Sequence, residues 1–297
     1  MTTVSPARDA AGKQAGKQGR PPAPEPLPSP VVDDHTHLDI AGSSRDGEPV
    51  DGLGVPELLQ MAADVGVPRA VQIGCDLPSA RWTVEVIDRH PQLVGGVALH
   101  PNEAPLLAQR GELASAWAEI ETLARHPRVR TVGETGLDHF RTGPEGREAQ
   151  RESFRWHIDL AKRLDLTLQI HDRDAHDDVL AVLEQEGAPP RTVFHCFSGD
   201  ADMARVCVEK GYHLSFAGTV TFSNAQNQRD ALAVTPPELL QVETDAPFLT
   251  PTPHRGRPNA SYLVPLTVRA MAQVLDVEVD ALCRVLDANA ERLYGPW

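Results

Sequence analysis

The sequence predicts an α/β protein built as a (β/α)8 barrel, a closed ring of parallel strands surrounded by helices. Short apolar runs alternate with amphipathic helical stretches from Val31 onward. These apolar runs are continuous rather than alternating, as expected for strands that are covered on both faces. A length of 297 residues accommodates one such barrel with a short appendage.

The apolar runs give the expected strands, and the stretches between them give the expected helices. Strands are expected at 31–35, 69–74, 93–99, 129–133, 167–170, 192–195, 211–216 and 239–243. Helices are expected at 55–66, 79–90, 112–126, 147–164, 174–186, 200–210, 225–233 and 260–274, followed by two short helices. Strands that alternate with helices imply a parallel sheet, and their number and length favour a closed barrel over an open doubly wound sheet.

Residues 1–30 differ in composition from the rest of the chain. They are rich in Pro, Ala, Gly, Gln and Lys and include the run PPAPEPLPSP. Such a stretch offers too little apolar surface to offset the entropy lost on ordering. We therefore expect a disordered leader over 1–30 and one barrel hydrolase domain over 31–297. A basic targeting or nucleic-acid-binding arm is the alternative, because the leader carries four Lys or Arg against two acids.

The composition narrows the class of protein. A formal net charge of −14 argues against a broad electrostatic nucleic-acid binder, but it is compatible with an enzyme that grips phosphates only at metal ions. No run of about 18 apolar residues could span a membrane, and no secretory signal precedes the first strand. The four cysteines form no CxxC pair. These features indicate a cytoplasmic protein with reduced thiols.

Five of the expected strands end in residues that bind metal ions well. The carboxyl ends of barrel strands meet at one face, where such barrels build their active sites. Four imidazoles and two carboxylates suit two divalent cations, with Zn²⁺ or Mn²⁺ favoured by the histidines and Mg²⁺ left open. The expected metal ligands are His35, His37, Glu134, His171, His195 and Asp245.

The type and spacing of these ligands suggest their roles. His35 and His37 form an HxH pair, and positions i and i+2 share one face of a strand, so both can bind one ion. Glu134 has two carboxylate oxygens and can bridge two cations. Asp245 can coordinate the first ion and accept a proton from the attacking water. Asp245 and Glu134 are therefore the catalytic candidates.

Other residues at the strand ends are candidates for supporting roles. His171 and His195 end the fifth and sixth expected strands and would supply the second ion. Glu243 lies two residues before Asp245, so it shares the same face one layer deeper and could orient a ligand or a water. His100 follows the third strand in VALHP and could contact the substrate or leaving group, with a loop role as the alternative.

Three arginines are candidates for substrate binding. Arg255 and Arg257 lie in HRGRPN, in the loop after the eighth strand, where barrels often bind phosphate. Arg173 follows the fifth strand, and its guanidinium group matches phosphate oxygens. Phe140, after the fourth strand, is a lesser candidate for stacking on a base. Cys196 follows a strand residue that faces the site, so it should face the helices.

The order and spacing of these motifs resemble the TatD family of metal-dependent deoxyribonucleases, within the amidohydrolase-like barrels. The motifs are DDHTHLD, HPNEAP, GETGLDHF, IHDRDA, FHCFSG, ETDAPFLTP and HRGRPN. The resemblance implies a (β/α)8 barrel that uses two divalent cations to hydrolyse phosphodiesters, typically from the 3′ end of single-stranded DNA and in some cases RNA. It places His35, His37, Glu134 and Asp245 at the first metal, and Glu134, His171 and His195 at the second.

Two features depart from the family pattern, and two other functions fit the fold. The leader has no counterpart, and ASYLVP follows HRGRPN where many members have an acid. An ester, lactone or amide hydrolase is the first alternative, although many such relatives bridge their metals with a carboxylated lysine where this chain has Glu134. A non-catalytic scaffold would be expected to lack the water-activating acid, yet Asp245 is present. A zinc base deaminase is disfavoured, since neither HxE nor PCxxC occurs.

Overall fold

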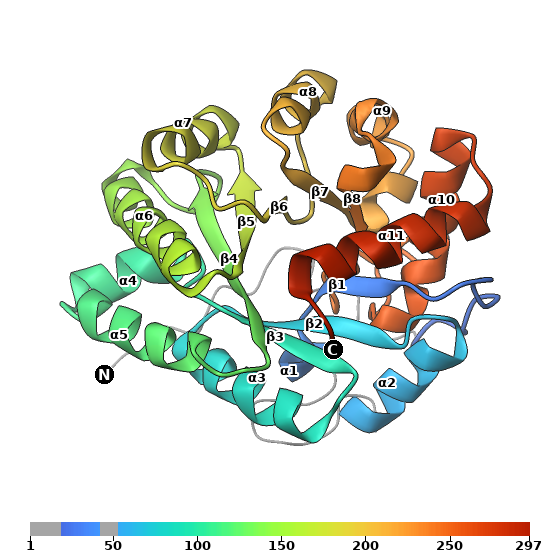
Figure 1. Cartoon of the computed structure of the whole chain (residues 1–297), viewed down its shortest axis with the longest axis horizontal. Helices are drawn as coiled ribbons and strands as arrows, with labels where there is room; N and C mark the ends of the chain where they lie inside the picture. Colours follow the sequence, from blue (N-terminus) through green and yellow to red (C-terminus); the bar gives the residue numbers. More distant parts are fainter. Residues whose placement is uncertain (1–18, 42–52) are drawn as a thin grey trace.

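The computed structural model describes residues 19–41 and 53–297. Within these residues eight parallel strands form one sheet in the order β1 to β8, and helices surround them (Figure 1). The structure therefore confirms the predicted (β/α)8 class. The strands are β1 (Val32–Thr36), β2 (Arg69–Gly74), β3 (Leu93–Val97), β4 (Val129–Asp138), β5 (Thr167–Arg173), β6 (Thr192–Phe194), β7 (His213–Phe216) and β8 (Leu240–Val242).

The helices begin and end close to the predicted boundaries, with differences in two places. They are α1 (Leu38–Ala41), α2 (Val55–Asp64), α3 (Leu77–Arg89), α4 (Glu103–Gln109), α5 (Leu113–Ala124), α6 (Arg147–Leu164), α7 (His176–Glu186), α8 (Ala201–Glu209), α9 (Gln226–Val234), α10 (Val264–Leu275) and α11 (Val279–Tyr294). The two expected short C-terminal helices are wrong, because α11 is continuous and buries Leu282, Leu286 and Leu293 at helical spacing. The short helices α1 and α4 were not predicted. Within the described residues, no helix has the length and hydrophobicity that crossing a bilayer requires.

Short polar side chains begin several helices immediately after the strands. Asp76 precedes α3 and accepts a hydrogen bond from Ser79 N at 2.8 Å. Asp200 precedes α8 and accepts from Met203 N at 3.0 Å. Each aspartate satisfies a backbone donor that the helix itself leaves unpaired. The strand-to-helix loops are fixed in this way at the barrel face that carries the candidate ligands.

Two hydrophobic clusters hold the barrel together. The larger one fills the space between strands and helices, as the continuous apolar runs require. The smaller one lies inside the ring, where Val32, Val71 and Val193 pack against Leu293 and Tyr294 of α11. In Figure 1, α11 lies across the strands. The last helix therefore closes the end of the barrel opposite the carboxyl ends of the strands.

The seam between β8 and β1 closes the ring and brings distant segments together. Thr36 and Ala246 form a parallel bridge. Asp245 N donates to His35 O at 3.0 Å, and His37 N donates to Ala246 O at 2.9 Å. Asp33 accepts hydrogen bonds from Thr244 N at 2.8 Å and from Thr244 Oγ1 at 2.7 Å. The same hydrogen bonds that complete the barrel therefore set Asp245 beside His35 and His37.

Residues 19–30 pack on the barrel, which differs from the disorder expected for 1–30; residues 1–18 lie outside the described residues. Leu27 is 7% exposed, and its N–H donates to Val65 O at 3.0 Å. Tyr262 Oη donates to Pro21 O at 2.7 Å. Arg257 donates to the carbonyls of residues 19 and 20. Composition does not reveal this packing, because the partners lie far away in the sequence.

We expect Leu27→Ala to lower the free energy of unfolding by about 2 kcal/mol, because it leaves a cavity between residues 19–30 and α2. The matched control is Leu106→Ala on α4, where the side chain is 44% exposed and its loss should change stability by less than about 0.5 kcal/mol. Urea denaturation followed by circular dichroism measures both. Equal midpoints for the two variants would show that Leu27 is not packed in solution.

Candidate metal centre

Glu134 lies at the centre of the clustered polar side chains. Its Oε2 atom is 2.8 Å from His195 Nε2 and 3.0 Å from His171 Nδ1. Its Oε1 atom is 3.8 Å from His37 Nε2. The glutamate is 5% exposed. Side chains from β1, β4 and β5 and from the end of β6 therefore meet around one buried carboxylate.

Two glycines allow β4 to approach β5 closely enough for this meeting. A Cβ atom at Gly136 would lie 2.0 Å from the carbonyl oxygen of His171, and φ at Gly136 is 143°. A Cβ atom at Gly133 would lie 2.6 Å from Cβ of Gln169. No side chain fits at either position without moving the neighbouring strand. Glycines on both sides of Glu134 thus bring it within reach of His171.

The outer nitrogen of each β1 histidine is held by an oxygen acceptor. His35 Nδ1 lies 2.8 Å from Gln169 Oε1, and His37 Nδ1 lies 3.1 Å from Ile73 O. These oxygens can only accept, so each Nδ1 carries a hydrogen and each Nε2 is the nitrogen left for a cation. The two Nε2 atoms lie 3.2 Å apart. Two nitrogens this close together could bind the same cation.

Gln169 fixes the tautomer of His35 because its own amide can lie only one way. Gln169 Nε2 donates to the carbonyl oxygen of Asp34 at 2.8 Å and to Tyr294 Oη at 2.7 Å. A carbonyl cannot donate, so the amide nitrogen must face Asp34 and the amide oxygen must face His35. Tyr294 in turn donates to Asp34 Oδ1 at 2.5 Å. The closing helix α11 is thus connected to a ligand of the centre.

The histidines of β5 and of the loop after β6 have carboxylates near both ring nitrogens. His195 Nδ1 lies 3.2 Å from Glu243 Oε1, and His171 Nε2 lies 3.4 Å from Asp138 Oδ2. Burial lowers the pKa of both rings, but the surrounding carboxylates raise it above the usual value, so each ring donates to Glu134 from its inner nitrogen. A bound cation would take the place of that hydrogen. Glu243, for which the sequence predicts an orienting role, contacts His195. The sequence patterns did not identify Asp138 as a candidate. It lies four residues after Glu134 on the same strand, β4, and therefore on the same face.

His100 has the opposite tautomer. Its Nδ1 accepts a hydrogen bond from the backbone N–H of Asn102 at 3.1 Å. Burial lowers the pKa of His100 to about 3, so the ring is neutral and its hydrogen lies on Nε2. Nε2 lies 4.0 Å from Glu134 Oε2. Of these five histidines, four turn toward the centre a nitrogen that a cation could bind, whereas His100 offers an N–H donor, which suits a substrate oxygen better than a metal ion.

Asp245 reaches the centre from the loop after β8. Its Oδ1 lies 3.3 Å from His37 Nε2, and its side chain is 17% exposed. Its φ angle is 52°, in the left-handed region that aspartate tolerates better than most residues. Asn259 Nδ2 donates to the carbonyls of Thr244 at 2.9 Å and Phe248 at 2.6 Å. Asn259 therefore holds both sides of the turn that presents Asp245.

The donor set and its charges fit divalent cations. Burial lowers the pKa of His35 well below its usual value, and the neighbouring His195 adds to this effect, so His35 is neutral. Burial would raise the pKa of Glu134, but the charge of His195 and the hydrogen bonds from His171 and His195 hold it well below the usual range. Donor atoms lie within 4.8 Å of one another in three groups: His35, His195 and Asp245; His35, His37 and Glu134; and His100, Glu134 and His171.

Two thiols also lie at the centre. Cys75 Sγ donates to Glu134 Oε1 at 3.2 Å. Burial, together with the charge of Glu134, raises the pKa of this thiol, which therefore stays protonated. The expectation that Cys196 faces the helices assumed a continuing strand. β6 ends at Phe194 and Cys196 has φ 45°, so strand alternation does not apply to it. Burial, followed by the charge of Glu243, raises the pKa of the Cys196 thiol well above its usual value.

The three arginines expected to bind substrate have different surroundings. The guanidinium groups of Arg173 and Arg255 lie over phenylalanine rings, 4.1 and 3.9 Å from the ring centroids. Arg257 instead donates to the carbonyls of residues 19 and 20. Its contacts fasten this N-terminal segment to the loop after β8, which differs from the phosphate contact predicted for it.

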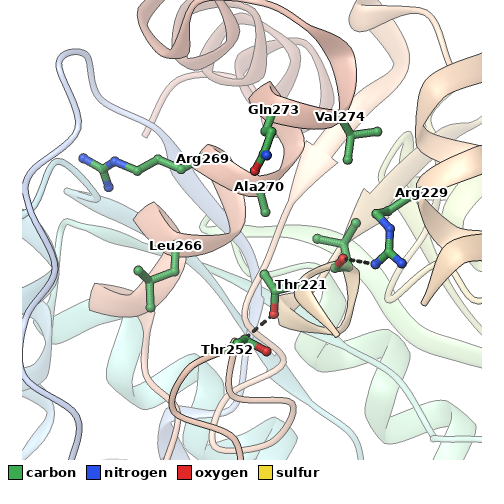
Figure 2. A pocket seen from close by; sticks show the side chains of 9 residues that line it. Thr221, Arg229, Thr252, Leu266, Arg269, Ala270, Gln273 and Val274 are labelled. Atoms are coloured by element: carbon green, nitrogen blue, oxygen red, sulfur yellow. Dashed lines mark hydrogen bonds between the residues drawn. The ribbon is translucent and has the colours of Figure 1, made fainter. Parts of the chain in front are cut away.

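A surface pocket lies apart from the metal centre. It has a volume of about 610 Å³ and lies between α10 and the 3₁₀ segment Gly218–Thr221 (Figure 2). Its polar groups are already engaged, since Arg229 donates to Val220 O at 3.0 Å and Thr252 N donates to Thr221 Oγ1 at 2.8 Å. None of the nine side chains drawn in Figure 2 belongs to the centre. This pocket therefore has no part in the chemistry of the site.

The chain matches known proteins over nearly its whole described length. A family model described as TatD related DNase matches residues 32–295. An uncharacterized metal-dependent hydrolase TatD of Mycobacterium tuberculosis is 46% identical, covering 89% of this chain and 98% of the relative. The uncharacterized metal-dependent hydrolase YabD of Bacillus subtilis is 34% identical, with coverage of 89% and 98%.

A solved structure supports the same assignment. The crystal structure of YjjV, a TatD homologue from Escherichia coli K12, has a TM-score of 0.80 and 26% sequence identity, covering 90% of this chain and 98% of that one. The family match and the 46% identical relative each extend over most of the chain. The protein therefore belongs to the TatD related DNase family and is a metal-dependent hydrolase.

Proposed function

We propose that the centre holds two divalent cations, Mg²⁺, Mn²⁺ or Zn²⁺. The first would be bound by His35, His37, Glu134 and Asp245, and the second by Glu134, His171 and His195. Glu134 lies between His37 after β1 and the imidazoles of His171 and His195, which supports a bridging carboxylate. The outer partners support the same ligand set, since an oxygen lies near the outer nitrogen of each of the four histidines.

We further propose that the enzyme is a deoxyribonuclease that hydrolyses phosphodiester bonds, acting from the 3′ end of single-stranded DNA, with RNA as a second substrate. The observation that carries this proposal is the Glu134 carboxylate, which lies among imidazoles at the mouth of the barrel. A paired-cation site of this kind can stabilise both the attacking and the leaving oxygen of a phosphoryl centre. The description of the matching family model agrees with a DNA substrate.

The protein's own residues would perform the remaining steps. The cations, once bound, supply positive charge for the phosphoryl oxygens and acidify the attacking water. Asp245, which is partly exposed beside His37, is placed to accept the proton of that water. The Nε2–H group of His100 would donate a hydrogen bond to a substrate oxygen, because its Nδ1 is already an acceptor. Glu243 and Asp138 would keep His195 and His171 oriented throughout.

An ester, lactone or amide hydrolase remains the second candidate, because the same centre could act on a carbonyl carbon. Glu134 stands where many such enzymes carry a carboxylated lysine, which favours the nuclease. A substrate panel separates the two functions directly.

We expect the protein to bind about two equivalents of Mn²⁺ or Zn²⁺ and, once loaded, to shorten a single-stranded oligonucleotide stepwise from its 3′ end. EDTA should abolish this cleavage and added metal should restore it, because every proposed step needs the cations. Elemental analysis and gel electrophoresis of end-labelled DNA measure the two quantities. Cleavage of esters or lactones alone would favour the second candidate, and the absence of bound metal would overturn both.

We expect Asp245→Asn to reduce turnover about 10²- to 10⁴-fold, the usual contribution of a general base, while the fold is retained. The matched control is Asp276→Asn, because Asp276 also has a left-handed backbone, at φ 53°, but lies at the end of α10. Single-turnover rates and thermal unfolding distinguish lost chemistry from lost structure. A near-normal rate for Asp245→Asn would remove this residue from the mechanism.

We expect Gln169→Leu to weaken metal binding about 10- to 100-fold, because His35 loses the acceptor that fixes its tautomer. Gln241→Leu is the matched control: Gln241 is also a buried strand residue, and its Nε2 has no hydrogen-bond partner among the described residues. Isothermal titration with Mn²⁺ and urea denaturation are measured for both variants. If the two variants bind metal equally well, Gln169 does not orient His35.

A further inference from the structure

An exposed aromatic ring and an arginine form a pair at the mouth of the barrel. The Phe140 side chain is 63% exposed, and the guanidinium carbon of Arg173 lies 4.1 Å from its ring centroid. The pair is fixed to the backbone on both sides, because Asp138 and Arg173 are register partners between β4 and β5. His139 N also donates to Arg173 O at 2.9 Å. The position of the Phe140–Arg173 pair therefore does not depend on a long loop.

The pair lies next to the metal centre. Arg173 is two residues beyond His171 on β5, so both side chains leave the same face of the strand. Phe140 follows Asp138, which contacts His171. A group bound to Phe140 would thus lie beside a substrate at the centre.

Neither residue has a structural partner that accounts for its position. Within residues 19–41 and 53–297, the side chain of Arg173 forms no hydrogen bond or ion pair, and it contacts the Phe140 ring. The second pair, Arg255 on Phe222, differs because Phe222 is only partly exposed. Phe140 therefore keeps an open ring face in water, while Arg173 keeps its N–H donors free for an anion.

The net charge of the protein makes such a local contact necessary. At −14 the chain gains no long-range attraction for a polyanionic strand. Affinity for the strand must then come from groups close to the scissile bond, namely the proposed cations, a free guanidinium group and an aromatic surface. Bases stack on aromatic rings largely without regard to sequence, whereas bases in a duplex are already stacked.

We propose that Phe140 and Arg173 form a nucleotide-binding subsite beside the scissile phosphodiester. A base of single-stranded nucleic acid stacks on the open face of Phe140, and the Arg173 guanidinium binds a phosphate of the same strand. This inference rests on the proposed phosphodiesterase function and extends it, because the subsite selects single strands over duplex and over simple esters.

The test compares an ordinary single strand with one whose 3′-terminal nucleotides are abasic tetrahydrofuran residues, which keep every phosphate. Phe140→Ala should raise KM for the ordinary strand about 5- to 150-fold, the usual contribution of one stacked base. Phe140→Ala should leave KM for the abasic strand unchanged. Phe140→Trp should keep KM for the ordinary strand close to the wild-type value. Arg173→Gln should raise KM for both strands, because both carry the phosphate that Arg173 would bind.

The controls are Val277→Ala, an exposed apolar side chain after α10, and Arg205→Gln on α8; neither should change KM. Affinity for a phosphorothioate-terminated strand with Mn²⁺, measured by fluorescence anisotropy, reports binding without turnover. Binding of this strand that Phe140→Ala weakens, with no cleavage of the ordinary strand, would overturn the nuclease but support the subsite. Cleavage with equal KM for Phe140→Ala and wild type on both strands would overturn the subsite alone. A protein that neither binds nor cleaves strands would overturn both.

Discussion

The structure of the site depends on one constraint: four imidazoles must present lone pairs, not hydrogens, to the same small volume. Three of them have a hydrogen-bond acceptor on the far side, from Gln169, Ile73 or Glu243, and Asp138 lies 3.4 Å from the outer nitrogen of the fourth, His171. If any outer partner became a donor, the ring would turn its hydrogen inward and repel a cation. His100, whose outer partner is a backbone N–H, shows this opposite case in the same centre.

These outer partners connect the centre to the barrel itself. Gln169 is held by Asp34 and by Tyr294, which lies at the end of the helix that closes the opposite end of the ring. The β8–β1 seam closes the barrel and at the same time sets Asp245 beside His37. Packing of α11 and closure of the sheet therefore contribute directly to the geometry of the ligands. A variant that loosens either would affect chemistry as well as stability.

The centre and the surface have opposite electrostatic character. The chain as a whole is acidic, whereas the bound cations would make the mouth of the barrel locally positive. In the proposed function, substrate selection would depend on short-range groups, namely the N–H of His100 and the Arg173–Phe140 pair. Such an arrangement would favour ligands that bring a phosphate and an unstacked ring together. It would disfavour binding along the length of a nucleic acid duplex.

The sequence by itself determined the barrel class, most strand and helix boundaries and the identity of the six candidate ligands. This was possible because the ends of barrel strands occupy defined positions, and because each residue type has a characteristic affinity for metal ions. Only the tertiary structure decided which nitrogen of each histidine faces inward, since that depends on partners such as Gln169 and Ile73 from other strands. The same reason explains the packing of residues 19–30, the role of Arg257 and the position of Cys196: contacts between segments far apart in the chain leave no local pattern in the sequence.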